Sequence, residues 1–218
     1  VIEVETTDGP IKTRTVLIAT GSDYKKLGIP GEAEYFARGV HYCATCDGAF
    51  YRDKRLVVVG GGNSAVQEAI FLTKYASHID LLVRGPKMRA SDVLQKELQK
   101  HADKITVHFN TTTDEIIATD NKVTSVKGTL NGSESVEIET DGVFIFIGLL
   151  PNTGFLKNTA IELDEVGLIK TNDKLETAIT GVFAAGDVRS GATMQIASAV
   201  GEGATAALRI REYIDEQN

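Results

Sequence analysis

An apolar run that ends in three consecutive glycines constrains the fold of this chain more than any other segment. The run covers residues 56–59, the glycines are Gly60, Gly61 and Gly62, and residues 63–76 repeat apolar positions with the period of a helix. A strand, a glycine-rich turn and a helix in this order are typical of a parallel βαβ unit. The sequence therefore predicts an α/β fold built around a parallel sheet.

The residues of this turn fit the spacing of a dinucleotide-binding fingerprint, Gly60-x-Gly62-x-x-Ala65. In such a fingerprint the first glycine permits a tight turn, the second lets the backbone approach a pyrophosphate, and the small third residue lets helix and strand pack closely. Asn63 and Ser64 begin the helix, whose first N–H groups and partial positive charge suit phosphate oxygens. We interpret these five residues as dinucleotide-binding; a turn with a purely structural role is the alternative.

The segment after the next expected strand, residues 78–83, indicates which dinucleotide binds. A cofactor without a 2′-phosphate usually meets an Asp or Glu at the end of this strand. Residues 84–89 contain no acid, but they include Arg84, Lys87 and Arg89, and guanidinium groups suit a phosphate. We therefore favour NADPH over NADH; a solvated basic loop is the alternative.

The chain has two cysteines, Cys43 and Cys46, and they lie three residues apart. Thiols at this spacing can close as a disulfide, and such motifs lower the pKa of one thiol. Asp47 follows Cys46 directly, where it is placed to donate or accept a proton during exchange. A zinc site needs four ligands and only His41 lies nearby, so we predict no metal; two unrelated buried thiols are the other alternative. His41 either tunes the pair or is an ordinary polar neighbour.

The composition excludes several classes of protein. With 42% hydrophobic and 24% charged residues, the chain resembles ordinary globular domains rather than disordered ones. No apolar run is long enough to span a membrane, and no signal segment opens the chain. A net charge of −7 argues against binding to nucleic acid. The scarcity of cysteine is typical of a cytoplasmic protein, which is the location we expect.

Local patterns predict the remaining elements. Turn residues between 1–6 and 13–19 predict a hairpin, and Asn-Gly between 122–130 and 134–140 predicts a second one. A long helical pattern at residues 193–215 closes the chain.

Three segments together resemble the low-molecular-weight thioredoxin reductases. Residues 39–48 (GVHYCATCDG) are similar to the redox-active motif of that family, residues 60–65 to its NADPH loop, and residues 181–188 (GVFAAGDV) to its C-terminal flavin motif. The motifs occur in the family's order, and the likeness runs along the whole chain.

The resemblance implies an NAD(P)-binding Rossmann-like domain inserted into a partial FAD-binding Rossmann-like domain, each with β-hairpin additions. On this chain the FAD-binding part would comprise residues 1–26 and 142–218. The inserted part would comprise residues 27–141 and carry the cysteines.

The family further implies a route for electrons from NADPH through FAD to a Cys43–Cys46 disulfide, and on to thioredoxin or a thioredoxin-like protein. By analogy, Cys46 faces the flavin, Cys43 attacks the disulfide of the partner, and Asp47 protonates the thiolate that leaves. A homodimer is a further expectation carried over from the family.

The expected FAD-binding residues lie at strand ends and at the start of the last helix. Asp187, after Gly186, is expected to accept a hydrogen bond from a ribityl hydroxyl, and the positive end of the helix to face the flavin. The expected set is Thr20, Gly21, Gly186, Asp187, Met194 and Gln195.

Two departures from the family pattern leave alternatives open. No strand, glycine loop and helix for FAD precede Val1, so we expect a fragment of a longer flavoprotein. The middle Arg of the family's NADPH motif is Gly85 here. The alternatives are a related flavoprotein that serves a peroxidase or takes electrons from ferredoxin, and a non-catalytic dinucleotide-binding module.

Overall fold

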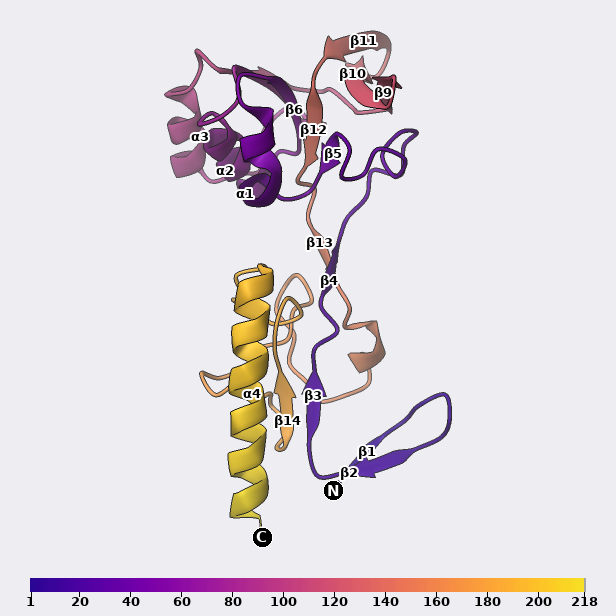
Figure 1. Cartoon of the computed structure of the whole chain (residues 1–218), viewed down its shortest axis with the longest axis vertical. Helices are drawn as coiled ribbons and strands as arrows, with labels where there is room; N and C mark the ends of the chain where they lie inside the picture. Colours follow the sequence, from indigo (N-terminus) through magenta and orange to yellow (C-terminus); the bar gives the residue numbers. More distant parts are fainter. Residues whose placement is uncertain (218) are drawn as a thin grey trace. The chain divides into compact units, whose positions relative to one another are not determined.

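The computed structural model describes residues 1–217 and divides them into two compact units. One unit, here called the outer unit, is formed by residues 1–23 and 149–217; the other, the inserted unit, is formed by Tyr24–Gly148. The sequence placed these boundaries at 26/27 and 141/142, a few residues away. Each unit is described by itself below (Figure 1).

The inserted unit is built on a five-stranded parallel sheet in the order β5–β12–β6–β7–β8. The strands are β5 (Val40–His41), β12 (Gly142–Ile145), β6 (Arg55–Val59), β7 (His78–Leu82) and β8 (Ile105–His108). The helices α2 (Asn63–Leu72) and α3 (Asp92–Gln99) connect β6 to β7 and β7 to β8. This arrangement confirms the predicted Rossmann-like α/β fold.

β12 explains why the unit boundary differs from the expected one. This strand lies between β5 and β6, with Phe144 opposite His41 on one side and Val58 on the other. The strand is fully buried at every position, so residues 142–145 belong to the core of the inserted unit. These residues were expected in the FAD-binding part.

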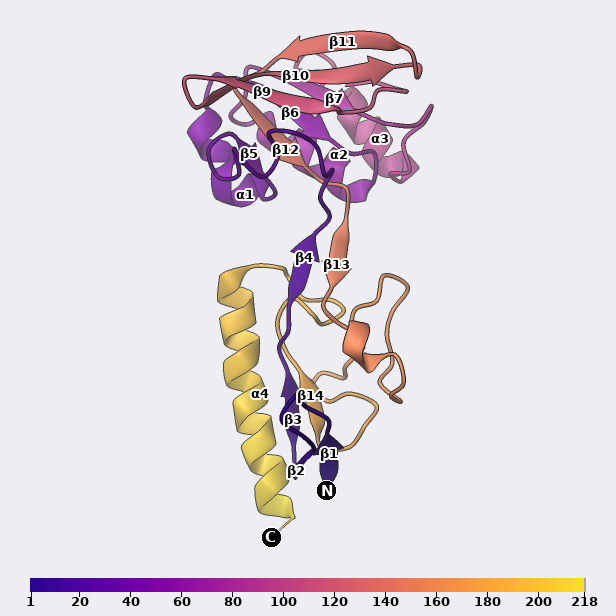
Figure 2. The same ribbon diagram turned by 90° about the vertical axis from the view of Figure 1, so that its right-hand side faces the viewer.

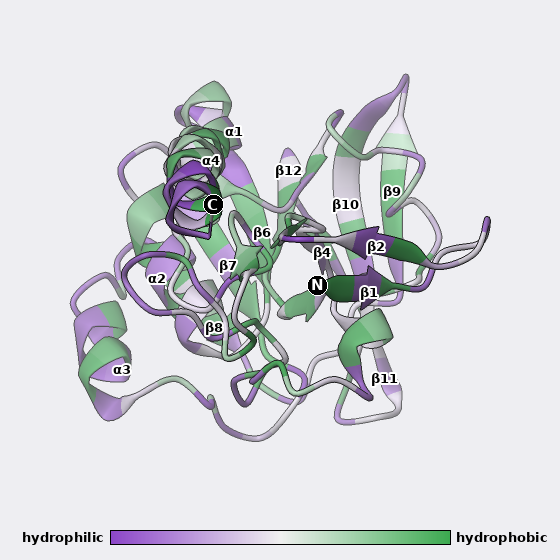
Figure 3. Cartoon of the chain, turned by 90° about the horizontal axis from the view of Figure 1, so that it is seen from below, coloured by the Kyte–Doolittle hydropathy of each residue, from purple (hydrophilic) through white to green (hydrophobic). Residues whose placement is uncertain are grey.

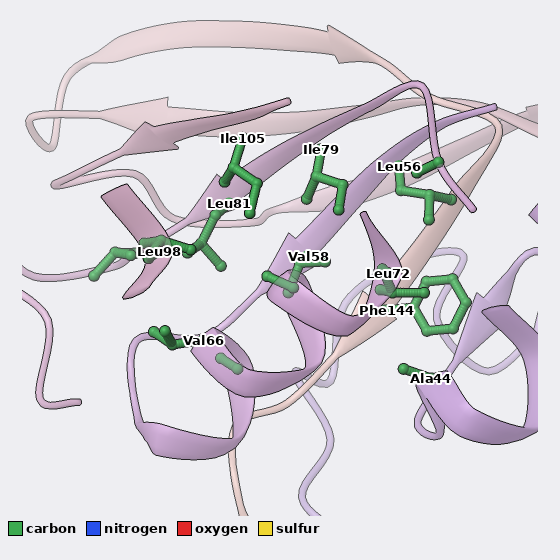
Figure 4. Packing of buried hydrophobic residues seen from close by; sticks show 14 of the residues in the cluster. Ala44, Leu56, Val58, Val66, Leu72, Ile79, Leu81, Leu98, Ile105 and Phe144 are labelled. Atoms are coloured by element: carbon green, nitrogen blue, oxygen red, sulfur yellow. The ribbon is translucent and has the colours of Figure 1, made fainter. Parts of the chain in front are cut away.

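Alternating residues of the central strands supply two cores, one on each face of the sheet. Leu56 and Val58 of β6 pack with Val66 and Leu72 of α2, as Figure 4 shows. Val57 and Val59 point to the opposite face and join a second buried cluster. Because strand residues alternate between faces, one short strand anchors both layers.

The second face is covered by a three-stranded antiparallel sheet (Figure 2). Its strands are β9 (Glu115–Thr119), β10 (Lys122–Leu130) and β11 (Glu134–Glu139). Asn131 and Gly132 both have positive φ, 52° and 76°, as the tight Asn-Gly turn between two strands requires. The predicted hairpin is therefore confirmed, with β9 added to it.

The outer unit has a smaller sheet. β3 (Val16–Ile18) pairs in parallel with β14 (Val182–Ala184), and the long helix α4 (Ile196–Glu216) packs near β14. β1 (Ile2–Val4) and β2 (Ile11–Thr13) form a hairpin in which apolar and polar residues alternate (Figure 3). A further two-stranded pair is formed by β4 (Ser22–Tyr24) and β13 (Leu149–Pro151).

Two details of the outer unit differ from expectation. The expected strand 13–19 is divided, because the Thr13 hydroxyl donates to the Thr15 carbonyl at 2.9 Å and the chain turns there. Helix α4 begins at Ile196 rather than residue 193, because Met194 adopts φ 58°, which no α-helix allows.

No helix in the described part of the chain is both long and apolar enough to cross a membrane.

The core of the inserted unit makes a prediction about stability. Val58→Ala should lower the free energy of unfolding by about 2 kcal/mol, because it removes two buried methyl groups and leaves a cavity. Val93→Ala on α3, where the side chain is 77% exposed, should change it by less than about 0.5 kcal/mol. Urea unfolding of both variants measures the difference; equal effects would contradict the assigned core.

Candidate functional site

The two cysteines form a disulfide on a short loop of the inserted unit. The loop consists of α1 (Ala44–Asp47) and the 3₁₀ turn η1 (Gly48–Tyr51), and it connects β5 to β6. Ala44 is buried in the same core as Leu72 and Phe144 (Figure 4). Cys46 is exposed and Cys43 is half-buried. The core thus anchors the loop from inside while one sulfur faces outward.

A backbone hydrogen bond distinguishes the two sulfurs. The N–H of Cys46 donates to Sγ of Cys43 at 3.1 Å. A donor aimed at sulfur favours the charged thiolate over the thiol when the disulfide is open. The local geometry therefore favours Cys43 as the sulfur that carries negative charge after reduction.

Asp47 is joined to a buried histidine and, through it, to a partly buried tyrosine behind the loop. Its Oδ2 lies 3.1 Å from Nδ1 of His41, and Nε2 of His41 lies 2.7 Å from the Tyr51 hydroxyl. Burial lowers the pKa of His41, although the Asp47 carboxylate opposes that effect. Burial, with the Asp47 and Asp141 carboxylates, raises the pKa of Tyr51 to about 12. His41 was expected from the sequence either to tune the cysteine pair or to be an ordinary polar neighbour; Tyr51 was not predicted from the sequence.

The glycine-rich turn lies where the sequence predicted it, between β6 and α2. Gly60 has φ +144°, and a side chain there would place Cβ 2.4 Å from the Phe146 carbonyl and 2.8 Å from Cβ of Ala65. Gly62 precedes α2 and has open space around it, so its backbone is accessible. Among the described residues, no side chain caps the N-terminus of α2. The turn therefore leaves room and backbone donors for a phosphate.

The residues that follow Gly62 have different surroundings. Asn63 and Ser64 are exposed, whereas Ala65 is fully buried against the turn. The Asn63 side chain accepts a hydrogen bond from the Ser91 backbone at 2.9 Å, and the Gly61 carbonyl accepts from Arg89 at 2.7 Å. These contacts attach the loop of residues 84–89, here called the basic loop, to the glycine-rich turn.

The basic loop places three charged side chains near this turn. Arg84, Lys87 and Arg89 are all exposed, and none of them forms an ion pair with another residue in the part of the chain that the structure describes. Their charges are thus available to an anionic ligand.

The parallel sheet relates the disulfide loop to the glycine-rich turn. His41 and Val58 lie level with each other, because both pair with Phe144 of β12. Two strand spacings separate them, about 10 Å. The disulfide loop follows His41 and the turn follows Val59, so both leave the carboxyl edge of the same sheet.

The outer unit contains a cavity of about 330 Å³. Thr20, Gly21, Gly186 and Asp187, all predicted as cofactor-binding, line it. Gly203 of α4 lines it as well, and a side chain at this position would meet open space. Gly203 thus helps to keep the cavity open.

One carboxylate oxygen of Asp187, a residue that lines this cavity, is buried without a hydrogen-bond donor in the described part of the chain. Its Oδ1 atom is buried and has no hydrogen-bond partner among the described residues, while the Ser22 hydroxyl donates to its backbone carbonyl at 2.5 Å. A buried carboxylate oxygen without a donor is costly, so such an atom is expected to meet one from a bound molecule.

Glu202 of α4 holds the loop that carries Gly186 and Asp187. Its carboxylate accepts from the Gly186 backbone at 2.8 Å and forms a two-pronged ion pair with Arg189. This pairing lowers the pKa of Glu202 and raises that of Arg189. Glu202 was not predicted from the sequence, because its partners lie 13 and 16 residues away.

Met194 and Gln195 lie directly before α4, both partly buried, and Gln195 is the N-cap residue of the helix. They do not line the cavity. The predicted site residues therefore fall into two groups. One group, with the cysteines, glycines and arginines, belongs to the inserted unit, and the other belongs to the outer unit. No cluster of three or more metal-ligating side chains occurs within residues 1–217.

A parallel sheet that carries a dinucleotide-type turn and a disulfide loop at one edge defines the class of nucleotide-linked disulfide oxidoreductases. The chain belongs to the pyridine nucleotide-disulphide oxidoreductase family, whose model matches residues 1–203.

Within this family the chain belongs with the thioredoxin reductases, which confirms the resemblance of its motifs. It is 46% identical over 207 residues to the thioredoxin reductase of Bacillus subtilis, covering 94% of this chain and 65% of that protein. It is 40% identical to the Treponema pallidum thioredoxin reductase, covering 99% of this chain and 69% of the relative. The chain thus spans about two thirds of the length of these relatives.

Solved structures agree with the sequence relatives. The thioredoxin reductase from Streptococcus pyogenes superposes with a TM-score of 0.89 at 42% identity, covering 97% of this chain and 69% of that one. The thioredoxin reductase from Giardia duodenalis gives 0.92 at 32% identity, covering 98% and 70%.

The glycine-rich turn makes a prediction that separates two glycines. Gly60→Ala should lower the free energy of unfolding by at least about 2 kcal/mol, because it combines a positive φ with a backbone clash. Gly62→Ala should change it by less than about 1 kcal/mol, because Gly62 has negative φ and open space. Urea unfolding checks both; a Gly62→Ala effect as large as that of Gly60→Ala would contradict the assigned turn.

Proposed function

We propose that this chain serves a flavin-dependent thioredoxin-disulfide reductase, in which electrons pass from NADPH through FAD to the Cys43–Cys46 disulfide and then to thioredoxin or a thioredoxin-like protein. The observation that carries the proposal is the formed disulfide, whose Cys46 is exposed, at the same sheet edge as the glycine-rich turn. A purely structural disulfide has no need of an adjacent carboxylate or of an open sulfur.

NADPH is proposed to bind the inserted unit. Its pyrophosphate would lie against the backbone of Gly60 and Gly62 and against the first residues of α2, Asn63, Ser64 and Ala65. The 2′-phosphate would be bound by Arg84 and Arg89, whose charges have no ion-pair partner among the described residues. Gly85 stands between them, so these two guanidinium groups would carry the selectivity for NADPH.

FAD is proposed to bind the outer unit. The orphaned Oδ1 of Asp187 and the cavity lined by Thr20, Gly21 and Gly186 fit a hydroxylated, elongated ligand of this kind. When bound, the flavin supplies a two-electron carrier between the nicotinamide and the disulfide. The N-terminus of α4, with Met194 and Gln195, would contribute a partial positive charge.

The residues of the disulfide loop have distinct roles in this proposal. Cys46, which is exposed, would receive the electrons, and Cys43 would attack the disulfide of the partner as a thiolate. The hydrogen bond from the Cys46 N–H to Cys43 Sγ supports the second role. Asp47 would donate a proton to the thiolate that leaves. The homodimer and the cytoplasmic location stay predictions.

Substitutions in the basic loop test whether NADPH is the electron donor. Arg84→Ala and Arg89→Ala should each weaken the binding of NADPH about tenfold, because each removes a charged hydrogen bond to the 2′-phosphate. Binding of NADH should change little, and Lys122→Ala on β10 should leave both affinities unchanged. Titration followed by nicotinamide fluorescence measures these affinities. Equal weakening for NADPH and NADH would contradict the assignment of the two arginines.

The function is tested by coupled reduction of oxidised thioredoxin, with NADPH and FAD supplied to the purified chain. The wild-type chain should consume NADPH in proportion to the thioredoxin thiols formed. Cys46→Ser should abolish thiol formation, because no disulfide remains to pass the electrons on. Thiol formation by Cys46→Ser at the wild-type rate would overturn the proposed function.

A further inference from the structure

A hydrogen-bonded row of three side chains lies directly behind the disulfide loop. The Tyr51 hydroxyl is 2.7 Å from Nε2 of His41, and Nδ1 of His41 is 3.1 Å from Oδ2 of Asp47. The three residues come from η1, β5 and α1, and Asp47 follows Cys46 in the chain. The row therefore connects the interior of the unit to the residue beside the exposed sulfur.

Packing fixes the two inner members of the row. His41 is opposite Phe144 in the parallel sheet, and the two rings stack with their centroids 5.1 Å apart. The Tyr51 ring meets both of these rings edge-on, at 5.3 and 5.5 Å. Gly142 makes room for it, since Cβ at this position would lie 2.4 Å from the Tyr51 ring. Neither ring can move without disturbing the sheet.

The middle of the row is shielded from solvent, whereas Asp47 and Tyr51 at its two ends are partly exposed. The His41 side chain is 7% exposed, whereas that of Asp47 is 32% exposed. Asp47 is therefore the member of the row that can take up a proton from solvent next to the cysteines. His41 has a second nitrogen and Tyr51 a hydroxyl, so the interior end can exchange donor and acceptor roles without losing a hydrogen bond.

The titratable groups around the row define its protonation at neutral pH. They are Asp47 on α1, Tyr51 on η1 and, acting on Tyr51, Asp141 before β12, which pairs with Lys54 at 3.2 Å. The pKa of Tyr51, about 12, keeps its hydroxyl protonated. The hydroxyl therefore donates to Nε2 of neutral His41, and Nδ1–H donates to the Asp47 carboxylate.

We propose that His41 and Tyr51 are positioning residues for Asp47, which hold its carboxylate beside Cys46 so that it can pass a proton from solvent to the leaving cysteine thiolate. The inference rests on the proposed role of the disulfide, and it adds two residues that the motif itself does not contain. A protonated His41 keeps both hydrogen bonds, because its two N–H groups donate to Asp47 and to the Tyr51 oxygen.

A small dithiol can reduce the disulfide in this way. A dithiol thiolate attacks one sulfur of the Cys43–Cys46 disulfide, the S–S bond breaks, and the other cysteine leaves as a thiolate. This thiolate takes up a proton that Asp47 relays from solvent. Asp47 takes up this proton from solvent at its exposed side, and His41 and Tyr51 keep their own protons throughout. The second dithiol sulfur then displaces the first cysteine, so that two electrons pass to the cysteines and the dithiol becomes a cyclic disulfide.

Four variants and one rate test this proposal. The rate is that of Cys43–Cys46 reduction by dithiothreitol, followed by acid quench, thiol alkylation and mass spectrometry. His41→Phe keeps a ring to stack on Phe144 but removes both hydrogen bonds, whereas His41→Asn can keep a donor toward Asp47. Tyr51→Phe removes only the hydroxyl. His101→Gln, after α3, is the matched control for loss of a histidine.

The pH dependence separates proton supply from a merely structural role. His41→Phe should reduce the disulfide about tenfold more slowly than wild type at pH 6, the factor expected for loss of one hydrogen bond to a charged group. At about pH 9 the difference should fall below about twofold, because a thiolate leaves without needing a proton. Tyr51→Phe should show a smaller loss with the same pH dependence, and His41→Asn should recover most of the rate at pH 6.

Three other results of these rate measurements would contradict the proposal. Equal slowing of His41→Phe at both pH values, or no recovery in His41→Asn, would overturn the proposal, provided that thermal unfolding shows both variants folded. A wild-type rate in folded His41→Phe would overturn it as well. The proposed function fails separately, if the wild-type disulfide is reduced readily by dithiothreitol but never by NADPH with FAD.

Discussion

The parallel pairing of β12 between β5 and β6 is the contact on which the rest of the inserted unit depends. It joins segments about 100 residues apart in sequence, and it brings the loops after β5 and β6 to one edge of the sheet. Without this pairing, Phe144 of β12 would have neither His41 nor Val58 as a neighbour. The core under Ala44 would then be exposed to solvent. The cost of ordering so distant a segment is offset by burial of every residue of β12.

The same pairing ties the chemistry of the disulfide loop to the core. Cys43 and Cys46 belong to a short loop whose conformation depends on contacts with the core. Ala44 is buried in that core, and the rings of His41, Tyr51 and Phe144 pack together behind the loop. The exposed sulfur and the half-exposed Asp47 are thus presented on a rigid support. In the outer unit, Glu202 has a similar role, since it fixes the loop of Gly186 and Asp187 against α4.

Local signals in the sequence predicted most elements, and distant contacts account for what they missed. The conformations of residues 56–65 and of the Asn131-Gly132 turn are determined by their own residue types. Both were therefore predicted correctly. β12 was assigned to the wrong unit because the apolar residues of a strand do not indicate with which strands it pairs. The row behind Asp47 was missed because Tyr51 reaches His41 only through the space that Gly142 leaves, 91 residues further along the chain.

The most direct test of the account follows the electrons through all proposed carriers. The chain is mixed with FAD under anaerobic conditions, and the visible flavin band is recorded after addition of NADPH and again after addition of oxidised thioredoxin. We expect the band of the wild-type chain to bleach with NADPH and to return with thioredoxin. The band of Cys46→Ser should bleach with NADPH but should not recover with thioredoxin. A wild-type band that fails to bleach with NADPH, or that recovers equally in Cys46→Ser, would contradict this account.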